Sequence, residues 1–363
     1  MRERVVLAPS MPDMTGSARN HPTDRTQVTD PSARLTEGSR VVVRRRLVGR
    51  EVTDVIGHLA GRTEELLLID TATGRVEVPR GEVVAAKPIP PRPTRPGPAH
   101  LRISIDDLAL LGAQGWVAVE QAPLGSWLLR SAPGYTGRAN SVLVVGDPGQ
   151  SLDEAVDEAV EHCERWYADR GQRTMFQVNG RTGFAVPDDP VGARLLERGY
   201  VAGGGRHDWD RVFVMTGPSS GIPAPAPDAP PVEVGDTLTE EWLLAYSEGR
   251  TPVPGITEAV LTGSEQQLFL SVRDEESGRL IAVTRLALHT GWAGVFGLWV
   301  HPEHRRRGLA RAVMAAAGRI AREGRMPAIY LQVSGDNDPA IRFYEGLGFT
   351  VHHEYTYLVQ PPA

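Results

Sequence analysis

The chain has 363 residues, of which 23% are charged and 41% hydrophobic, and its formal net charge at pH 7 is −6. This length exceeds one ordinary domain and predicts two or three. The charge balance shows no basic bias of the kind that points to nucleic acid, so no nucleic-acid partner is expected. A single cysteine, Cys163, excludes an intrachain disulfide framework and a cysteine-rich metal site.

No apolar run is long enough to span a membrane, and no signal-peptide pattern is present. We therefore expect no membrane partner and a cytoplasmic location. Cys163 shares a helical stripe with apolar residues, which favours a buried small hydrophobe over a nucleophile. The sequence leaves the oligomeric state open between monomer and homodimer.

The N-terminal part divides into a polar stretch and a run of short strands. Residues 1–37 are polar and lack periodicity, which predicts a disordered leader. Strands are then predicted at 40–47, 52–60, 65–70 and 75–78, with turn residues between them. Residues 38–88 are therefore similar to SH3-like domains, and a small β-barrel that binds a ligand or partner is expected. Its one run of arginines, Arg44 to Arg46, is offset by acids and fits a solvated face.

Proline-rich segments separate the predicted regions of the chain. The 29 prolines concentrate at residues 87–98 and 217–232, which predicts two domain boundaries. Between them, strands are predicted at 126–131, 141–145, 174–178 and 211–215, and helices at 152–170 and 192–198. The region from residue 295 onward repeats this order of strands and helices. The chain therefore contains two copies of one fold, or the two regions share a common order of elements by coincidence. The turn after residue 145 contains Asp147 and no arginine, which is unsuited to a phosphate.

The segment 298–311 is the most informative part of the sequence. An apolar strand ends at Pro302, three arginines precede Gly308, and a helix is predicted over 311–322. Backbone N–H groups at a helix start, supported by guanidinium groups, form a binding site for a pyrophosphate. The pattern is Arg-x-x-Gly-x-Ala, from Arg305, Gly308 and Ala310, and it matches neither of the two common phosphate loops. His301 and His304 flank the loop without zinc-site spacing and are expected to contact phosphate or solvent.

A second motif follows one predicted strand later. The strand covers 328–333, and Asn337 then caps a helix that has Pro339 in its first turn. The apolar face of this helix includes Phe343 and Tyr344, and Gly348 ends it.

Together the two segments resemble the acyl-CoA loop and the Asn-x-x-Ala-x-x-Phe-Tyr signature of the GCN5-related N-acetyltransferase (GNAT) superfamily, over residues 268–359. The whole chain resembles an actinobacterial group of three-part acetyltransferases described as N-acetylglutamate synthase-like. The implied fold class is α+β, with an SH3-like barrel at 38–88, a degenerate GNAT-like lobe at 101–216, a proline-rich linker at 217–232 and a catalytic GNAT domain at 233–363.

The resemblance implies acetyl-CoA as the cosubstrate and no metal. It implies that Tyr344 protonates the leaving thiolate, with Asn337 at the start of the same helix as the second catalytic residue, and that the Val300 N–H binds the thioester oxygen. The residues implied to contact the cosubstrate are Leu298, Trp299, Val300, Arg305, Arg306, Arg307, Gly308, Leu309, Ala310, Arg311, Asn337 and Tyr344.

The general base is not identified by the sequence. Members of the superfamily often carry a glutamate near the start of the strand equivalent to 292–300, and that strand has no carboxylate here. Deprotonation would therefore use a water chain or another group. His352, His353 and Glu354 are candidates, although a surface role is favoured for each.

The implied reaction transfers an acetyl group to the amine of a small molecule, and the resemblance points to glutamate. Such an acceptor would need arginines in the cleft, for which Arg285 is a candidate. Other acceptors remain open, namely a protein lysine or N-terminus, an antibiotic amine or a mycothiol-type precursor. A CoA-sensing scaffold without turnover is the alternative of a different class.

Overall fold

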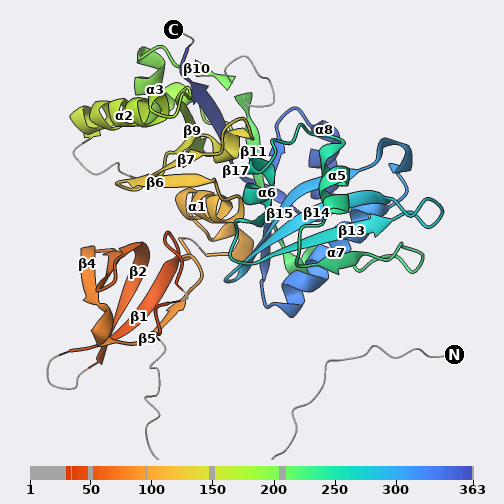
Figure 1. Ribbon diagram of the computed structural model, residues 1–363, viewed down its shortest axis with the longest axis horizontal. Helices are drawn as coiled ribbons and strands as arrows, with labels where there is room; N and C mark the ends of the chain where they lie inside the picture. Colours follow the sequence, from red (N-terminus) through yellow and green to blue (C-terminus); the bar gives the residue numbers. More distant parts are fainter. Residues whose placement is uncertain are drawn as a thin grey trace, which may run out of the picture.

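The computed structural model describes residues 30–33, 35–47, 52–94, 96–146, 152–203 and 210–361. The predicted leader lies mostly on residues 1–29, outside this part of the chain. Figure 1 shows a small sheet set apart from a larger body. Among the described residues, no helix is both long and apolar enough to cross a membrane.

The small sheet has five strands in the order β4-β3-β2-β1-β5. Its strands are β1 Arg40–Arg46, β2 Val52–Arg62, β3 Leu66–Thr71, β4 Gly74–Pro79 and β5 Val83–Pro88. The expected SH3-like barrel is not found in the described residues, because the edge strands β4 and β5 have no pairing register with each other. Leu35 is buried in the core of this sheet beside Val41 and Val43, so the residues around it pack with the sheet although the predicted leader extended to residue 37.

Two polar contacts join the small sheet to the body. His58 Nε2 lies 3.2 Å from Asp107 Oδ1, and the Thr36 hydroxyl donates to Glu265 Oε2 at 2.9 Å. Because Asp107 and Glu265 belong to different halves of the body, the small sheet contacts both halves.

The body begins with a lobe of mixed helices and strands. Its elements are α1 Ile105–Gly115, β6 Glu120–Leu124, β7 Trp127–Ser131, β8 Val142–Leu143, α2 Leu152–Ala168, β9 Met175–Gly180, α3 Pro190–Glu197 and β10 Val201–Ala202. Ser104 caps α1 by accepting from the Asp107 N–H, and Asp189 caps α3 by accepting from the Gly192 N–H. The predicted helices and strands of this region are confirmed, whereas α1, β6 and β10 were not predicted. Cys163 is buried as expected, and burial raises the pKa of its thiol to about 12.

The remaining elements carry the two sequence motifs. They are β11 Val212–Pro218, β12 Glu233–Gly235, α5 Glu240–Ser247, α6 Ile256–Thr262, β13 Gln267–Arg273, β14 Leu280–His289, β15 Trp292–Val300, α7 Leu309–Glu323, β16 Ala328–Ser334, α8 Asp338–Glu345 and β17 Thr350–Val359. Helix α7 begins within the motif that predicts phosphate binding. Helix α8 begins directly after Asn337, its predicted cap.

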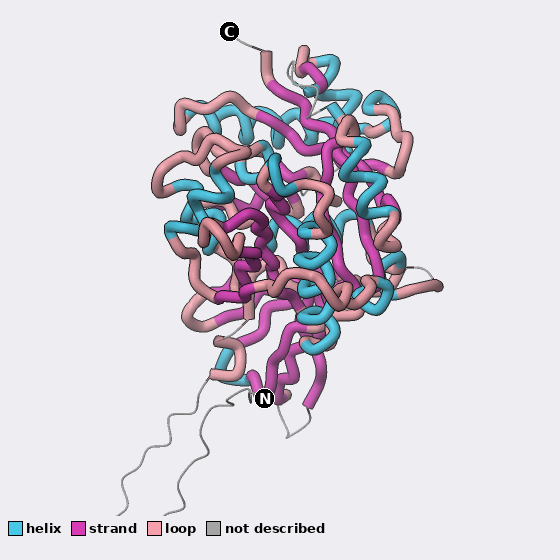
Figure 2. The backbone as a smooth tube through the Cα atoms, turned by 90° about the vertical axis from the view of Figure 1, so that its right-hand side faces the viewer, coloured by secondary structure: helices cyan, strands magenta, loops and turns pink. Residues whose placement is uncertain are grey.

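One continuous sheet runs through the body in the order β12-β13-β14-β15-β16-β11-β17-β9-β8-β7-β6. Each half contains a parallel pair, β15 with β16 and β8 with β9. The strand beside β16 is β11, from the first lobe by sequence, and the strand beside β9 is β17, the last strand of the chain. The two lobes therefore exchange their final strands, which pair with each other in the middle of the sheet (Figure 1). Figure 2 shows helices on both sides of the strands of the body.

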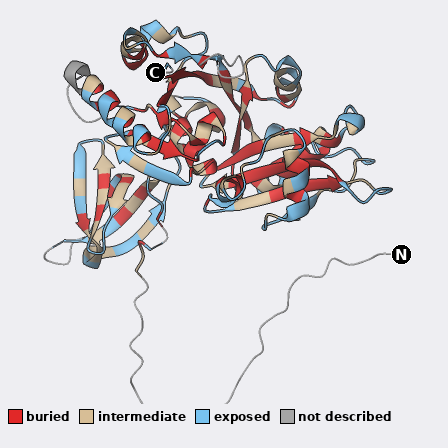
Figure 3. Cartoon of the chain, turned by 45° about the horizontal axis from the view of Figure 1, so that its top comes forward, coloured by how far each residue is buried: buried red, intermediate tan, exposed pale blue. Residues whose placement is uncertain are grey.

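The exchanged strands pair across the boundary that the sequence predicts between two lobes. The boundary between 101–216 and 233–363 follows the proline-rich linker in sequence, but it does not separate two sheets in space. Strand 211–215 was placed in the first lobe, yet β11 pairs with β16 along its whole length. Figure 3 shows the central strands as largely buried, as expected for a sheet covered on both faces.

Different helices cover the two faces of the second half of this sheet. One core combines Tyr344 of α8 with residues of α7 and with Val295 and Leu331. The other combines Trp116, at the end of α1, with α5, α6 and Phe296. The first lobe therefore contributes directly to one face of the sheet that carries the motifs.

Candidate active site

Strands β15 and β16 separate where the site begins. Their parallel register runs from Trp292 with Ala328 to Val295 with Leu331 and ends there, although both strands continue. An unpaired edge of β15 from Phe296 onward can accept an extended ligand by backbone pairing. Strand β15 therefore diverges from β16 after Val295.

A β-bulge at Gly297 accompanies this separation. The pairing of β14 with β15 shifts between Val283 and Arg285, and Gly297 has a φ of 65°. Only glycine adopts this conformation readily, and an added Cβ would also lie 2.7 Å from a ring carbon of Tyr246. The bulge thus fixes where β15 turns away from β16 and where α5 packs against it.

The backbone of Val300 faces away from β14. The His301 N–H donates to Ile281 of that neighbouring segment at 2.8 Å, and successive N–H groups of a strand point in opposite directions. The Val300 carbonyl also accepts from Arg305 Nε at 3.2 Å. The Val300 N–H therefore lies on the open edge of β15, where the resemblance placed the donor for a thioester oxygen.

The loop between β15 and α7 has the conformation that an anion site requires. Gly308 is left-handed, with a φ of 81°, and is the N-cap of α7 without a side-chain cap. The first N–H groups of the helix, from Leu309 to Arg311, thus have no intrahelical acceptor. An added Cβ at Gly308 would meet nothing within 4 Å, so the need for glycine is conformational. Arg306 also has a positive φ, of 60°.

The arginines of this loop are available to a ligand. Arg305, Arg306 and Arg307 are exposed, and none of them forms an ion pair within the described part of the chain. A groove of about 600 Å³ borders the loop and includes Arg307 and the acidic turn at Asp274. His301 and His304 face carboxylates, with His301 Nε2 3.7 Å from Glu248 and His304 Nδ1 4.0 Å from Asp274.

Tyr344 lies on α8 with its ring between Phe343 and Phe349. The residue is 8% exposed, and burial raises the pKa of its hydroxyl to about 12, against a smaller lowering effect of Arg250. The hydroxyl therefore stays protonated at neutral pH and can act as an acid. Asn337 accepts from the Ala340 N–H at 3.2 Å, so its side chain caps the helix that positions Tyr344.

Arg285 is not in an open cleft, contrary to the expectation that it binds an acceptor. Its side chain is fully buried and donates to Leu261 O at 2.6 Å, Gly115 O at 2.7 Å and Ser264 Oγ at 2.7 Å. Burial lowers the pKa of this guanidinium to about 10. Arg285 therefore joins the ends of α1 and α6, which come from the two lobes.

The residues proposed as general base also have structural partners. Glu354 forms an ion pair with Arg211 at 2.8 Å. His352 contacts the carbonyl of Ile103 through Nε2 at 3.1 Å and His353 through Nδ1 at 2.9 Å. His353 is fully buried, and burial lowers the pKa of its ring to about 3.

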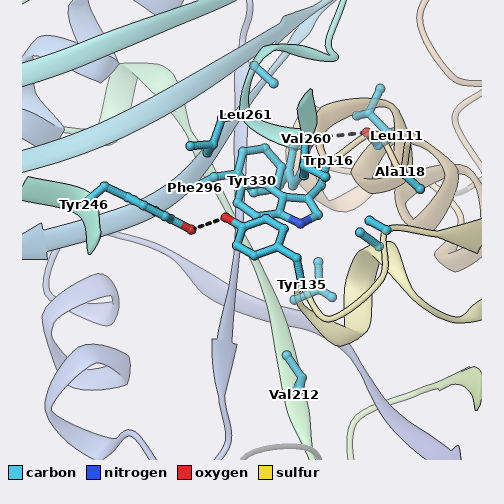
Figure 4. Close-up of a cluster of buried hydrophobic side chains, with 14 of the residues drawn as sticks. Leu111, Trp116, Ala118, Tyr135, Val212, Tyr246, Val260, Leu261, Phe296 and Tyr330 are labelled. Atoms are coloured by element: carbon cyan, nitrogen blue, oxygen red, sulfur yellow. Dashed lines mark hydrogen bonds between the residues drawn. The ribbon is translucent and has the colours of Figure 1, made fainter. Parts of the chain in front are cut away.

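Residues from the first lobe reach this site, and sequence reasoning missed them. Tyr135 donates or accepts a hydrogen bond of 2.6 Å with Tyr246 of α5, and Trp116 stacks against Phe296 of β15 (Figure 4). Arg138 lies over the Trp116 ring at 5.0 Å. No local periodicity marks these residues, because their partners lie more than a hundred positions away in the chain.

The residues present fit acetyl-CoA. The open edge of β15 suits an extended pantetheine arm, the start of α7 suits a pyrophosphate, and exposed arginines surround the loop. Among the predicted contact residues, Leu298, Trp299 and Val300 lie on the separated part of β15, and residues 305–311 form the loop and first turn of α7.

The sequence matches proteins of related architecture. Residues 104–358 match the family described as "Probable histone acetyltransferase Rv0428c C-terminal". The uncharacterized N-acetyltransferase YobR of Bacillus subtilis is 24% identical over 262 residues, which cover 69% of this chain and 96% of that protein. A mycothiol acetyltransferase of Nocardiopsis dassonvillei is 42% identical over 57 residues, 16% of this chain and 17% of that protein.

Among solved structures, a tandem GNAT protein from the clavulanic acid biosynthesis pathway has a TM-score of 0.51 and 16% identity. The similarity covers 74% of this chain and 91% of that chain, so both lobes share its fold. The family match likewise extends from the start of α1 to the end of β17. The chain therefore belongs to the family described as probable histone acetyltransferase Rv0428c C-terminal, and it is an acetyltransferase of the GNAT type.

Proposed function

We propose that the protein transfers the acetyl group of acetyl-CoA to the amine of a small molecule, with glutamate as the first acceptor to test. The observation that carries this proposal is the separation of β15 from β16 immediately before the Gly308 turn, with Tyr344 packed against the same part of the sheet. Donor binding and an acid for the leaving group are thus supported by neighbouring elements.

Acetyl-CoA would supply the acetyl group as a thioester. The N–H groups at the start of α7 attract the negatively charged phosphates, and the three loop arginines add to this attraction. The Val300 N–H lies on the open edge of β15, where a donor stabilises negative charge that develops on a carbonyl oxygen. Tyr344 remains a neutral phenol at physiological pH and holds the proton that the leaving sulfur requires.

The direct test combines acetyl-CoA with a panel of amines and measures the release of free thiol. Release that depends on a small amine, together with a product of the matching mass, is expected. Binding of acetyl-CoA without thiol release over the whole panel would refute enzymatic turnover and favour a CoA-sensing scaffold. Replacing Arg305 and Gly308 together should abolish acetyl-CoA binding measured by calorimetry, and tight binding by that variant would refute the loop assignment.

A second acceptor class is a protein lysine, because the family description names a histone acetyltransferase. Lysine-containing histone peptides therefore belong in the panel. Faster turnover on the peptides than on any small amine would favour this class instead.

A further inference from the structure

The loop between β7 and β8 extends from the first lobe to the separated strands of the second. Within it, Tyr135 bonds to Tyr246, and Arg138 Nη1 contacts Gln332 Oε1 at 3.4 Å. Gln332 directly follows Leu331, the last residue of β16 that pairs with β15. Arg138 therefore lies at the β16 side of the point where the two strands separate.

Arg250 reaches the same point from the other side. It follows α5, and Nη1 contacts the Tyr246 carbonyl at 3.3 Å while the guanidinium lies 4.3 Å above the Tyr246 ring. The preceding residue, Gly249, packs so closely on β15 that an added Cβ would lie 2.9 Å from the Trp299 ring. Arg250 is thus on the β15 side of the separated strands.

These two guanidinium groups lack a counter-charge of their own. Both side chains are half-buried, and within the residues that the structure describes neither forms an ion pair. The aromatic rings that they lie over, Trp116 for Arg138 and Tyr246 for Arg250, are both buried. Burial and the neighbouring Tyr246 raise the pKa of Tyr135 far above its usual range despite both arginines, so this hydroxyl is neutral and does not compensate their charge.

The first-lobe loop is held in a strained and rigid form. Thr136 has a φ of 55°, which is unfavourable for a β-branched residue and is typically retained at functional positions. The Trp116 indole donates to its hydroxyl at 3.0 Å. The Asn140 amide donates to the carbonyls of Tyr135 at 2.9 Å and Thr136 at 3.2 Å. The loop is thereby fixed with Arg138 directed toward the second lobe.

We infer that Arg138 and Arg250 together bind a carboxylate of the acetyl acceptor, so that the acceptor is an amino acid or a related amino carboxylate. This inference rests on the proposed acetyl transfer and assigns the first lobe a part in acceptor recognition. Two unpaired guanidinium groups match a carboxylate well, because each supplies several N–H donors in a fixed plane. The carboxylate would lie between the arginines, and its amine would point to the gap between β15 and β16.

The test uses the full chain and the variants R138Q and R250Q, with R138K and R250K as conservative forms. Steady-state rates are compared for the natural amino acids and for their amides, in which every carboxylate is replaced by an uncharged carboxamide. Each glutamine variant should raise KM for the carboxylate acceptors about ten- to hundredfold and leave the amides nearly unchanged. The KM for acetyl-CoA should not change, and the lysine variants should recover part of the loss. R165Q, on an exposed part of α2, is the matched control and should behave as wild type.

Binding is measured separately, by calorimetry of the same amino acids with CoA present. Binding to wild type that is lost in R138Q and R250Q supports the inference. It is overturned if no amino acid binds, or if the variants weaken amides and acids equally. Binding of the amino acids without acetyl transfer would instead contradict the proposed function and still support the carboxylate site.

Discussion

Tyr344 has a buried position, and its proposed role is that of an acid. Its ring belongs to the core beside α7, and burial raises its pKa to about 12. We expect Tyr344→Phe to lower kcat roughly hundredfold or more, because a positioned acid contributes on this scale. The Kd of acetyl-CoA, measured by calorimetry, should stay within about twofold because the ring is retained.

Tyr200→Phe provides the control for this change. Its hydroxyl bonds to Glu164 at 3.0 Å in the first lobe, away from the motifs. A kcat for Tyr344→Phe as high as that of the control would exclude Tyr344 as the acid. In wild type, the basic side of the pH–rate profile should show no loss from deprotonation of Tyr344 below pH 10, since its pKa is about 12.

His353 links the stability of the protein to pH. Its pKa is about 3 in the folded protein and about 6.5 without burial, so below pH 6.5 the unfolded chain binds a proton that the folded chain does not. Its contribution to the free energy of unfolding should fall by about 1.4 kcal/mol per pH unit between pH 6 and pH 4.5. Urea unfolding of wild type and His353→Gln over this pH range measures this contribution. If the free energy of unfolding changed equally with pH in the two proteins, the low pKa of His353 would be contradicted.

For single residues, the sequence predicts those structural features that a local motif determines. Asn337 forms the capping bond that its motif predicted, and Gly308 lies between the predicted strand and the predicted helix. Arg285 was a candidate for binding the acceptor. Only its tertiary contacts show that its three nitrogen donors already bind groups of the protein. Arg138 and Arg250 were not identified, because their common location depends on how two distant segments pack.

Among the elements, the turn into α7 makes the sharpest prediction. An alanine at Gly308 would meet no neighbouring protein atom, so the cost within the protein comes from its φ of 81°. We expect Gly308→Ala to weaken acetyl-CoA binding about tenfold, since a left-handed alanine costs about 1–2 kcal/mol. Asparagine tolerates this conformation better, so Gly308→Asn should lose less. Calorimetric affinities that are equal for the two variants would indicate a steric rather than a conformational requirement.

The elements themselves were mostly predictable, but their partners were not. The strand pattern at 211–215 is apolar and β-branched, and the structure confirms a strand there as β11. Nothing in that pattern indicates whether it pairs with β9 or with β16, because both are buried strands of similar composition. Pairing over long sequence separation is fixed by the assembled core, which a local window does not contain.

For the whole molecule, the exchanged strands make the two lobes depend on each other. β11 completes the sheet of the half that carries the two motifs, and β17 completes that of the first lobe. Arg285 adds a buried link, because it joins the carbonyl ends of α1 and α6. Carbonyl groups at helix C-termini favour a cation, so this arginine needs no carboxylate partner to be stable. The proline-rich linker is therefore a covalent connection between strands of one unit, rather than a hinge between two.

This arrangement predicts that the half with the two motifs does not fold alone. A fragment of residues 232–361 retains both motifs but lacks β11, so the edges of β16 and β17 lose their hydrogen-bonding partner. Unpaired buried backbone groups are costly, and an exposed apolar edge promotes aggregation. We expect this fragment to be insoluble or to lack a cooperative thermal transition by circular dichroism. Co-expression with residues 96–231 should yield a soluble complex that unfolds in a single transition, because each fragment then supplies the other's missing strand. A cooperative transition of the isolated 232–361 fragment at the temperature of the full chain would show that the exchange contributes little to stability.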